Sequence, residues 1–147
     1  MSEFLIKMTE FPIDFENDRF SRYSFFKKNN NSDFKDYLDF SFKGIGDQGI
    51  HNLIIQQRSS LNHIKILYLG ANQITGEGIS ILSTYLINNQ QLQHLSLESN
   101  HIGDQGCLPL GIMLRNNNHL ISLIIGGNNI GDQGAIEISE SLKINQT

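Results

Sequence analysis

A glycine-rich segment is the first feature that could do chemistry, since Gly44-Ile45-Gly46-Asp47-Gln48-Gly49 has the Gly-x-Gly-x-x-Gly spacing of dinucleotide sites. Such a site also needs an acidic residue about 20 residues further on to bind the ribose. The chain instead has Leu67, Tyr68 and Leu69 there. The Gly-Asp-Gln-Gly part recurs twice without the leading glycine. The pattern therefore indicates repeat geometry, and we predict no bound cofactor.

Side chains that could bind a metal or act as nucleophiles are few: His51, His63, His94, His101, His119 and Cys107. No two histidines are one helical turn apart, as a helical zinc site requires. Cys107 takes a place that the other repeats give to small or aliphatic residues, so we interpret it as a core residue. The chain has no Gly-x-Ser-x-Gly elbow and no Gly-Lys-Ser/Thr phosphate loop. We predict no metal site, no catalytic residue and no enzymatic activity.

Composition excludes further classes of function. The 147 residues suit one domain, and the formal net charge of -4 disfavours a nucleic-acid partner, which needs clustered Lys and Arg. One cysteine excludes an intrachain disulfide and suits a reducing compartment. No apolar run approaches the about 18 residues of a membrane span, and none is long enough for a signal peptide. We predict a soluble cytoplasmic protein that binds neither nucleic acid nor membrane.

Internal repeats organise most of the chain. Ile-Gly-Asp-Gln-Gly occurs at 45–49, 102–106 and 130–134, with a variant at 74–78, so its leading isoleucines are almost evenly spaced. The last three units place apolar residues, an asparagine and a glycine at the same slots: Ile64, Leu67, Leu69, Asn72, Ile74 and Gly78; Leu92, Leu95, Leu97, Asn100, Ile102 and Gly106; Leu120, Leu123, Ile125, Asn128, Ile130 and Gly134. A fixed period of about 28 residues is typical of stacked units.

Each unit combines a short strand with a helix. Apolar residues alternate with period two around 95–97 and return with a period near four after Gly106. We expect residues just before the helices to cap the helices of their own repeats: Asp47, Thr75, Asp104 and Asp132. One such unit cannot bury its apolar face alone, so its neighbours must stack and join their strands. We predict a right-handed α/β solenoid with four parallel strands.

The unit Leu92-x-x-Leu95-x-Leu97-x-x-Asn100-x-Ile102 resembles the leucine-rich repeat. The period and the Ile-Gly-Asp-Gln-Gly helix start look like the ribonuclease-inhibitor-like subclass, which is also found in innate-immune nucleotide-binding receptors and Ran GTPase-activating proteins. The resemblance covers residues 36–147. It implies a horseshoe arc with strands on the concave face and helices on the convex face. It also implies a buried asparagine ladder formed by Asn72, Asn100 and Asn128.

The N-terminal part has a different composition, because all nine phenylalanines lie between Phe4 and Phe42. The first repeat is degenerate, with Lys43 in the asparagine slot. We predict an N-terminal capping segment over residues 1–33 and a leucine-rich-repeat domain of four repeats over 34–147. In the capping segment, Phe11, Ile13 and Phe15 alternate with polar or turn residues and could cover the open end of the first repeat.

Strand residues between the buried leucines point to the concave face, where we predict that a protein or peptide binds. The predicted contact residues are Tyr37, Asp39, Ile66, Tyr68, His94, Ser96, Glu98, Ser122 and Ile124. Ile66, Tyr68 and Ile124 are apolar or aromatic where solubility alone favours charge, as is typical of protein interfaces. We expect Tyr68 to be the main anchor and the convex helix faces to carry few concentrated apolar groups.

Two alternative functions stay open. Family analogy alone suggests a GTPase-activating or other regulatory role. The other alternative is a fragment or subunit of a larger leucine-rich-repeat receptor, because the next leading leucine would fall just past Thr147 and no cap follows the last helix. We therefore expect the C-terminal end of the solenoid to be open, with self-association there as a possible outcome.

Overall fold

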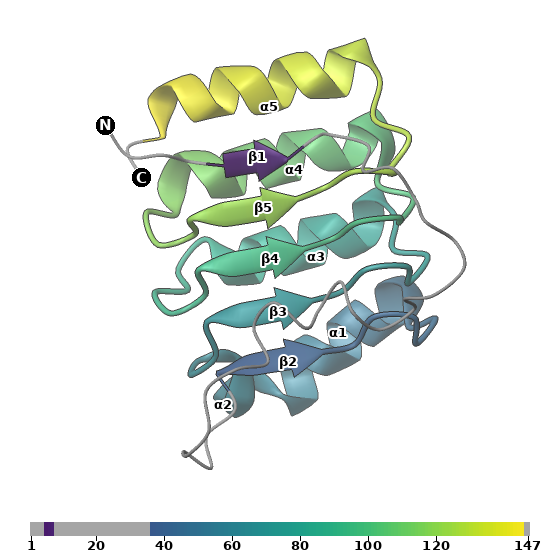
Figure 1. The fold of residues 1–147 in the computed structure, drawn as a ribbon, viewed down its shortest axis with the longest axis vertical. Helices are drawn as coiled ribbons and strands as arrows, with labels where there is room; N and C mark the ends of the chain where they lie inside the picture. Colours follow the sequence, from purple (N-terminus) through teal and green to yellow (C-terminus); the bar gives the residue numbers. More distant parts are fainter. Residues whose placement is uncertain (1–4, 8–35, 146–147) are drawn as a thin grey trace, which may run out of the picture.

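The computed structural model describes residues 5–7 and 36–145, and from residue 66 onwards strands alternate with helices (Figure 1). The elements are β1 (Leu5–Lys7), β2 (Tyr37–Asp39), α1 (Gly46–Gln56), α2 (Arg58–Leu61), β3 (Ile66–Tyr68), α3 (Gly76–Leu86), β4 (His94–Ser96), α4 (Gly103–Asn116), β5 (Ser122–Ile124) and α5 (Asp132–Ile144). No helix of the described ranges is long and apolar enough to cross a membrane.

The strands form one parallel sheet in the order β1-β5-β4-β3-β2. Leu95 of β4 pairs with Leu67 of β3 on one side and with Leu123 of β5 on the other. The pairing register therefore reproduces the period of the sequence. This confirms the α/β solenoid, whereas the expected number of four strands is too low, because β1 adds a fifth at the edge of β5.

The hydrophobic core lies between the sheet and the helices, which all cover the same face (Figure 1). Leu67, Leu95 and Leu123 in the strand centres are at most 1% exposed, and Leu110 and Leu114 of α4 are equally buried. Full burial of a leucine stabilises the fold by about 1.5–3 kcal/mol. Strand and helix thus bury their apolar residues against each other, and adjacent repeats extend the same core.

The aspartate caps are not where the sequence analysis expected them. Helix α1 begins at Gly46 and α4 at Gly103, so Asp47 and Asp104 lie inside the first turns of their own helices and cap neither. Asp132 is the first residue of α5 and makes no capping bond there. Only the variant repeat follows the expectation, since Thr75 Oγ1 accepts a hydrogen bond from Glu77 N at 3.2 Å.

A left-handed residue follows each strand from β2 to β5 at the same slot of the repeat. The φ angles are 60° at Phe42, 53° at Ala71, 56° at Ser99 and 67° at Gly127. This conformation costs a residue with a Cβ about 1–2 kcal/mol, whereas glycine adopts it without strain. The turn out of the strand is therefore imposed by the stacked geometry. Of these four positions, only that of the last repeat is occupied by glycine, the residue that adopts this conformation without strain.

The C-terminal end of the solenoid differs from the expectation, and the N-terminal expectation is not tested by the described residues. The outer edge of β5, which we expected to be open, is paired with β1. The residues expected to cover the first repeat, Phe11, Ile13 and Phe15, lie outside the described residues. The N-terminal segment therefore contributes its described strand to the last repeat.

Candidate interaction surface

Buried asparagines fix the exits of the strands. Asn100, 1% exposed, accepts hydrogen bonds at Oδ1 from the backbone N–H groups of Asn72 (2.9 Å) and Ile74 (3.0 Å). Its Nδ2 donates to the carbonyls of Leu69 and Leu97 at 2.9 and 2.8 Å. Asn72 and Asn128 make corresponding bonds to the preceding repeat. An amide suits this slot because it donates and accepts at once.

A second asparagine column, at Asn89, Asn117 and Asn145, joins the repeats where each helix returns to the sheet. Asn117 Nδ2 donates to the carbonyls of Leu86 at 2.7 Å and Asn89 at 3.0 Å in the preceding repeat. Its Oδ1 accepts from the backbone N–H of Leu120 at 2.9 Å. The sequence shows the spacing of this column, but the backbone groups that it binds became apparent only in the structure.

Aspartates in the first helical turn of one repeat bind the start of the helix in the next repeat. Asp104 Oδ1 accepts hydrogen bonds from the backbone N–H groups of Gly131 at 2.7 Å and Gly134 at 3.1 Å, both at the start of the next helix. A Cβ on Gly134 would lie 2.5 Å from that oxygen and 2.8 Å from Cys107 Sγ. The Gly-Asp-Gln-Gly motif is thus explained by contact between repeats. The aspartate carboxylate of one repeat leaves no room for a Cβ at the last glycine of the motif in the next repeat.

The concave face is the sheet face opposite the helices, and it brings the nine predicted contact residues to neighbouring strands. The register forms one column of Tyr37, Ile66, His94 and Ser122 and a second column of Asp39, Tyr68, Ser96 and Ile124. Glu98 follows β4 directly after the buried Leu97. Neighbours in a column are about 5 Å apart, so they can contact one partner together.

Burial divides these residues into two groups. Tyr68 is 9% and Ser96 4% exposed, so the centre of the second column is buried. Asp39 is exposed, and Ile66 and Ile124 are half-buried at the sides. The expected anchor, Tyr68, therefore has little free surface of its own, whereas Ile66 and Ile124 present more.

The charges among these residues are few and acidic, with Asp39 in the first repeat and Glu98 in the third. Burial lowers the pKa of His94 below its ordinary value, so this imidazole is neutral at pH 7. In the described parts of the chain, no three His, Cys, Asp or Glu side chains group as metal ligands do. The arrangement offers hydrogen bonds, carboxylates and apolar contact to a partner.

The single thiol lies away from this surface. Cys107 is fully buried in α4, and its Sγ donates to the carbonyl of Gly103 at 3.4 Å. Burial, together with the carboxylates of Asp104 and Glu137, raises the pKa of the Cys107 thiol to about 11. A thiol that stays protonated at neutral pH is a poor nucleophile, which agrees with its interpretation as a core residue.

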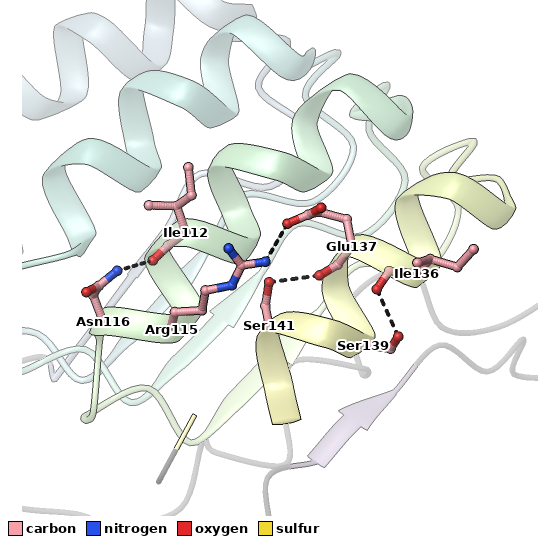
Figure 2. A network of polar contacts seen from close by, with 7 residues as sticks. All are labelled: Ile112, Arg115, Asn116, Ile136, Glu137, Ser139 and Ser141. Atoms are coloured by element: carbon pink, nitrogen blue, oxygen red, sulfur yellow. Dashed lines mark hydrogen bonds and ion pairs between the residues drawn. The ribbon is translucent and has the colours of Figure 1, made fainter. Parts of the chain in front are cut away.

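The convex face holds more apolar surface than the sequence analysis expected. Leu108 and Ile112 on α4 and Ile136 on α5 are 52%, 41% and 54% exposed. Figure 2 shows Ile112 and Ile136 beside the ion pair that joins these helices, in which Arg115 Nη2 lies 2.7 Å from Glu137 Oε1. Helical spacing of Leu108 and Ile112 was the available signal for this patch.

A shallow groove of 440 Å³ lies between the first helices and α3 on the same side. Its walls are Ile54, Arg58, Ser80, Ile81, Thr84 and Tyr85. The Tyr85 hydroxyl donates to Asn62 Oδ1 at 2.7 Å, and burial raises the pKa of Tyr85 above its ordinary value. The groove is mostly apolar with one guanidinium at its wall, and the sequence pattern gave no direct sign of it.

Comparisons with known proteins agree with this architecture. The leucine-rich repeat family matches residues 60–83, 88–111 and 116–139. A solved structure of leiomodin-1 actin-binding site 2 is similar to this chain with a TM-score of 0.63 and 23% sequence identity, over 74% of this chain and 64% of that chain. This chain therefore spans less than two thirds of that relative. No curated protein sequence gave a significant match.

The three matched segments are evenly spaced and follow the same period as the strands and helices. Each covers one strand and most of the helix that follows it. The chain therefore contains three leucine-rich repeats, over residues 60–83, 88–111 and 116–139.

Proposed function

We propose that the chain is a non-catalytic protein-interaction module that binds a protein or peptide on its concave face. The observation that carries the proposal is the register of β2 to β5, which lines up Tyr37, Ile66 and His94 in one column and Asp39, Tyr68 and Ile124 in the next. Helices cover the other face of the sheet, so this face is where its outward side chains act.

The side chains of this surface favour a partner with apolar and basic groups. Ile66 and Ile124 offer aliphatic contact on both sides of the buried centre, and Asp39 and Glu98 provide carboxylates near it. In protein interfaces, apolar contact at the centre usually supplies affinity, and the charges around it usually fix the orientation of the partner. A segment with an aliphatic or aromatic side chain next to Lys or Arg fits this description.

The solved relative is an actin-binding region, so actin is the first defined probe for this chain. We further propose that the repeats belong to the ribonuclease-inhibitor-like subclass, which is supported by the length of the repeat period and by a full helix in each repeat. The cytoplasmic location and the absence of a nucleic-acid partner stay predictions from composition.

Site-specific photocrosslinking tests the proposal. A benzophenone amino acid is placed at Ile66 or Ile124 on the concave face, and at Ile112 or Leu108 on the convex face as matched aliphatic controls. After incubation with purified actin, and separately with a cell extract, irradiation should give the same crosslinked species from both concave positions and none from the controls. Crosslinks from the convex positions alone would overturn the concave assignment.

A charge variant tests the same surface without a crosslinker. Glu98→Lys reverses a half-buried carboxylate of the concave face and should weaken binding of the captured partner at least tenfold. Glu140→Lys reverses an exposed carboxylate on α5 and should leave binding unchanged. Tyr68→Ala is less suitable, since Tyr68 is buried and its truncation would also lower stability.

A further inference from the structure

The strand β1 stands where the strand of one more repeat would stand. On the inner side of β5, Ser122, Leu123 and Ile124 pair with His94, Leu95 and Ser96. On the outer side, the same three residues pair in parallel and without a shift with Leu5, Ile6 and Lys7. β1 lies beside β5 (Figure 1), and Ile6 thereby takes the register position of Leu38, Leu67, Leu95 and Leu123.

The hydrogen bonds between repeats show which groups the outer edge of β5 offers. The carbonyl of Gln93 accepts from the N–H groups of Ile121 and Ser122 at 2.8 and 3.0 Å at the start of the strands. At their ends, Leu97 N donates to Ile124 O at 2.8 Å and Ser99 N to Gly126 O at 2.8 Å.

The last repeat has equivalent backbone groups 28 residues further along the chain. The corresponding groups on the outer edge are the carbonyl of Ile121 and the N–H groups of Ile125 and Gly127. An extended segment aligned as β1 is would bind this row of groups by its backbone.

We propose that the outer edge of β5 is a strand-acceptor site for an extended peptide in parallel orientation, with an apolar residue opposite Leu123, and that β1 of the same chain is its resident occupant. The apolar requirement follows from the register, because the position opposite Leu123 continues a column that is buried in β3, β4 and β5. The proposal is independent of the concave binding site, since it concerns the edge of the sheet.

The short pairing of β1 makes this occupant replaceable. β1 and β2 are the two edge strands, and residues 8–35 connect them along the chain. Among the described residues β1 forms three residue pairs, so a competing segment that pairs over a greater length can displace it.

A cysteine pair tests the resident occupant in the full chain. Lys7→Cys with Ile124→Cys joins register partners, and Cys107→Ala removes the native thiol at a slot where the next repeat has Ala135. Mild oxidation should give a monomeric protein with an intrachain disulfide. The control pair is Lys7→Cys with Asp39→Cys, which lies at the same register level on the opposite edge strand and should stay unlinked.

Hydrogen exchange tests the acceptor site itself. Leu5→Pro removes the N–H at the register level of Ser122, whose own N–H donates to the Gln93 carbonyl of the preceding repeat, and should speed exchange of the Ile125 amide at least tenfold. The Leu97 amide, buried between β4 and β5, should keep its rate and report that the repeats remain folded. A synthetic peptide of residues 1–10 at millimolar concentration should restore the slow exchange at Ile125. The same peptide with Ile6→Asp should not.

The outcomes separate the alternatives. An intrachain disulfide and peptide rescue together support the proposal. A disulfide only between chains would overturn β1 as the occupant in the same chain and assign the edge to a second copy. Equal exchange of Ile125 in the parent chain and in Leu5→Pro, with a normal Leu97 amide, would overturn the acceptor site.

Discussion

Asp47 and Thr75 belong to different repeats, yet the Asp47 carboxylate accepts hydrogen bonds from both the Thr75 backbone N–H at 2.8 Å and the Thr75 hydroxyl at 2.6 Å. Thr75 in turn caps α3 through its contact with Glu77 N. Helix α3 is therefore held at its first turn by the preceding repeat. The same relation joins Asp104 to α5, so the aspartates stabilise the stacking of repeats.

Asp47→Ala should lower the free energy of unfolding by about 1 kcal/mol, the usual loss for a helix cap. The matched control is Asp132→Ala, because Asp132 occupies the same slot but has no hydrogen-bond partner among the described residues. Urea unfolding followed by circular dichroism measures both variants. A loss for Asp132→Ala as large as that for Asp47→Ala would contradict the role of the contact between repeats.

Asn100→Ala should be more destabilising than Asn116→Ala. The first change leaves the buried N–H groups of Asn72 and Ile74 without their acceptor, at about 1–3 kcal/mol for each group. Asn116 is exposed and makes one bond to the carbonyl of Ile112 at 2.7 Å (Figure 2). The sequence favours a loop at this position, whereas Asn116 is the last residue of α4, which still leaves it a suitable control. Equal shifts of the urea midpoint would contradict this prediction.

Ser99→Gly should stabilise the protein by about 0.5–1 kcal/mol, because the relief of left-handed strain exceeds the extra entropy that glycine gives the unfolded chain. The φ angle of Ser99 is 56°. Gly127→Ala at the equivalent slot, with a φ of 67°, should have the opposite effect of similar size. Thermal unfolding of the two variants gives the comparison, and a lower melting temperature for Ser99→Gly would show that the serine side chain outweighs the strain.

Acidification should destabilise the protein through His94. Burial lowers the His94 pKa in the folded state, so the unfolded state, with a pKa near 6.5, binds the proton more tightly. The contribution of neutral His94 to stability is thus present above about pH 6.5 and is lost as the pH falls through the folded value. His94→Gln should reduce the difference between urea midpoints at pH 7 and pH 5. An unchanged difference would mean that other groups set the pH dependence.

The repeat pattern predicts most of this fold because each unit is a translated copy of its neighbour. Once Leu67, Leu95 and Leu123 are recognised as one slot, the register of β3, β4 and β5 follows from the period. The concave columns could be predicted for the same reason. The surface that each residue offers to a partner could not be predicted. Tyr68, for example, is buried because of its surroundings in three dimensions, which the period does not specify.

Two features could not be predicted from the sequence, for physical reasons. Asp104 lies close to the start of its own helix in sequence and to the start of the next helix in space, and spacing along one chain cannot tell which helix it serves. Leu5-Ile6-Lys7 is a short segment without any repeat motif, so nothing in its composition pairs it with β5 at the far end of the chain.

The sheet order also determines when the parts of the molecule can meet during synthesis. Of the described strands, β1 leaves the ribosome first and its neighbour β5 leaves last. The contacts from β2 to β5 join successive units and can form as each emerges, whereas the pairing of β1 closes the longest loop of the fold and carries its greatest entropic cost. A nascent chain stalled before β5 would therefore carry a complete first strand with no partner in its own sheet.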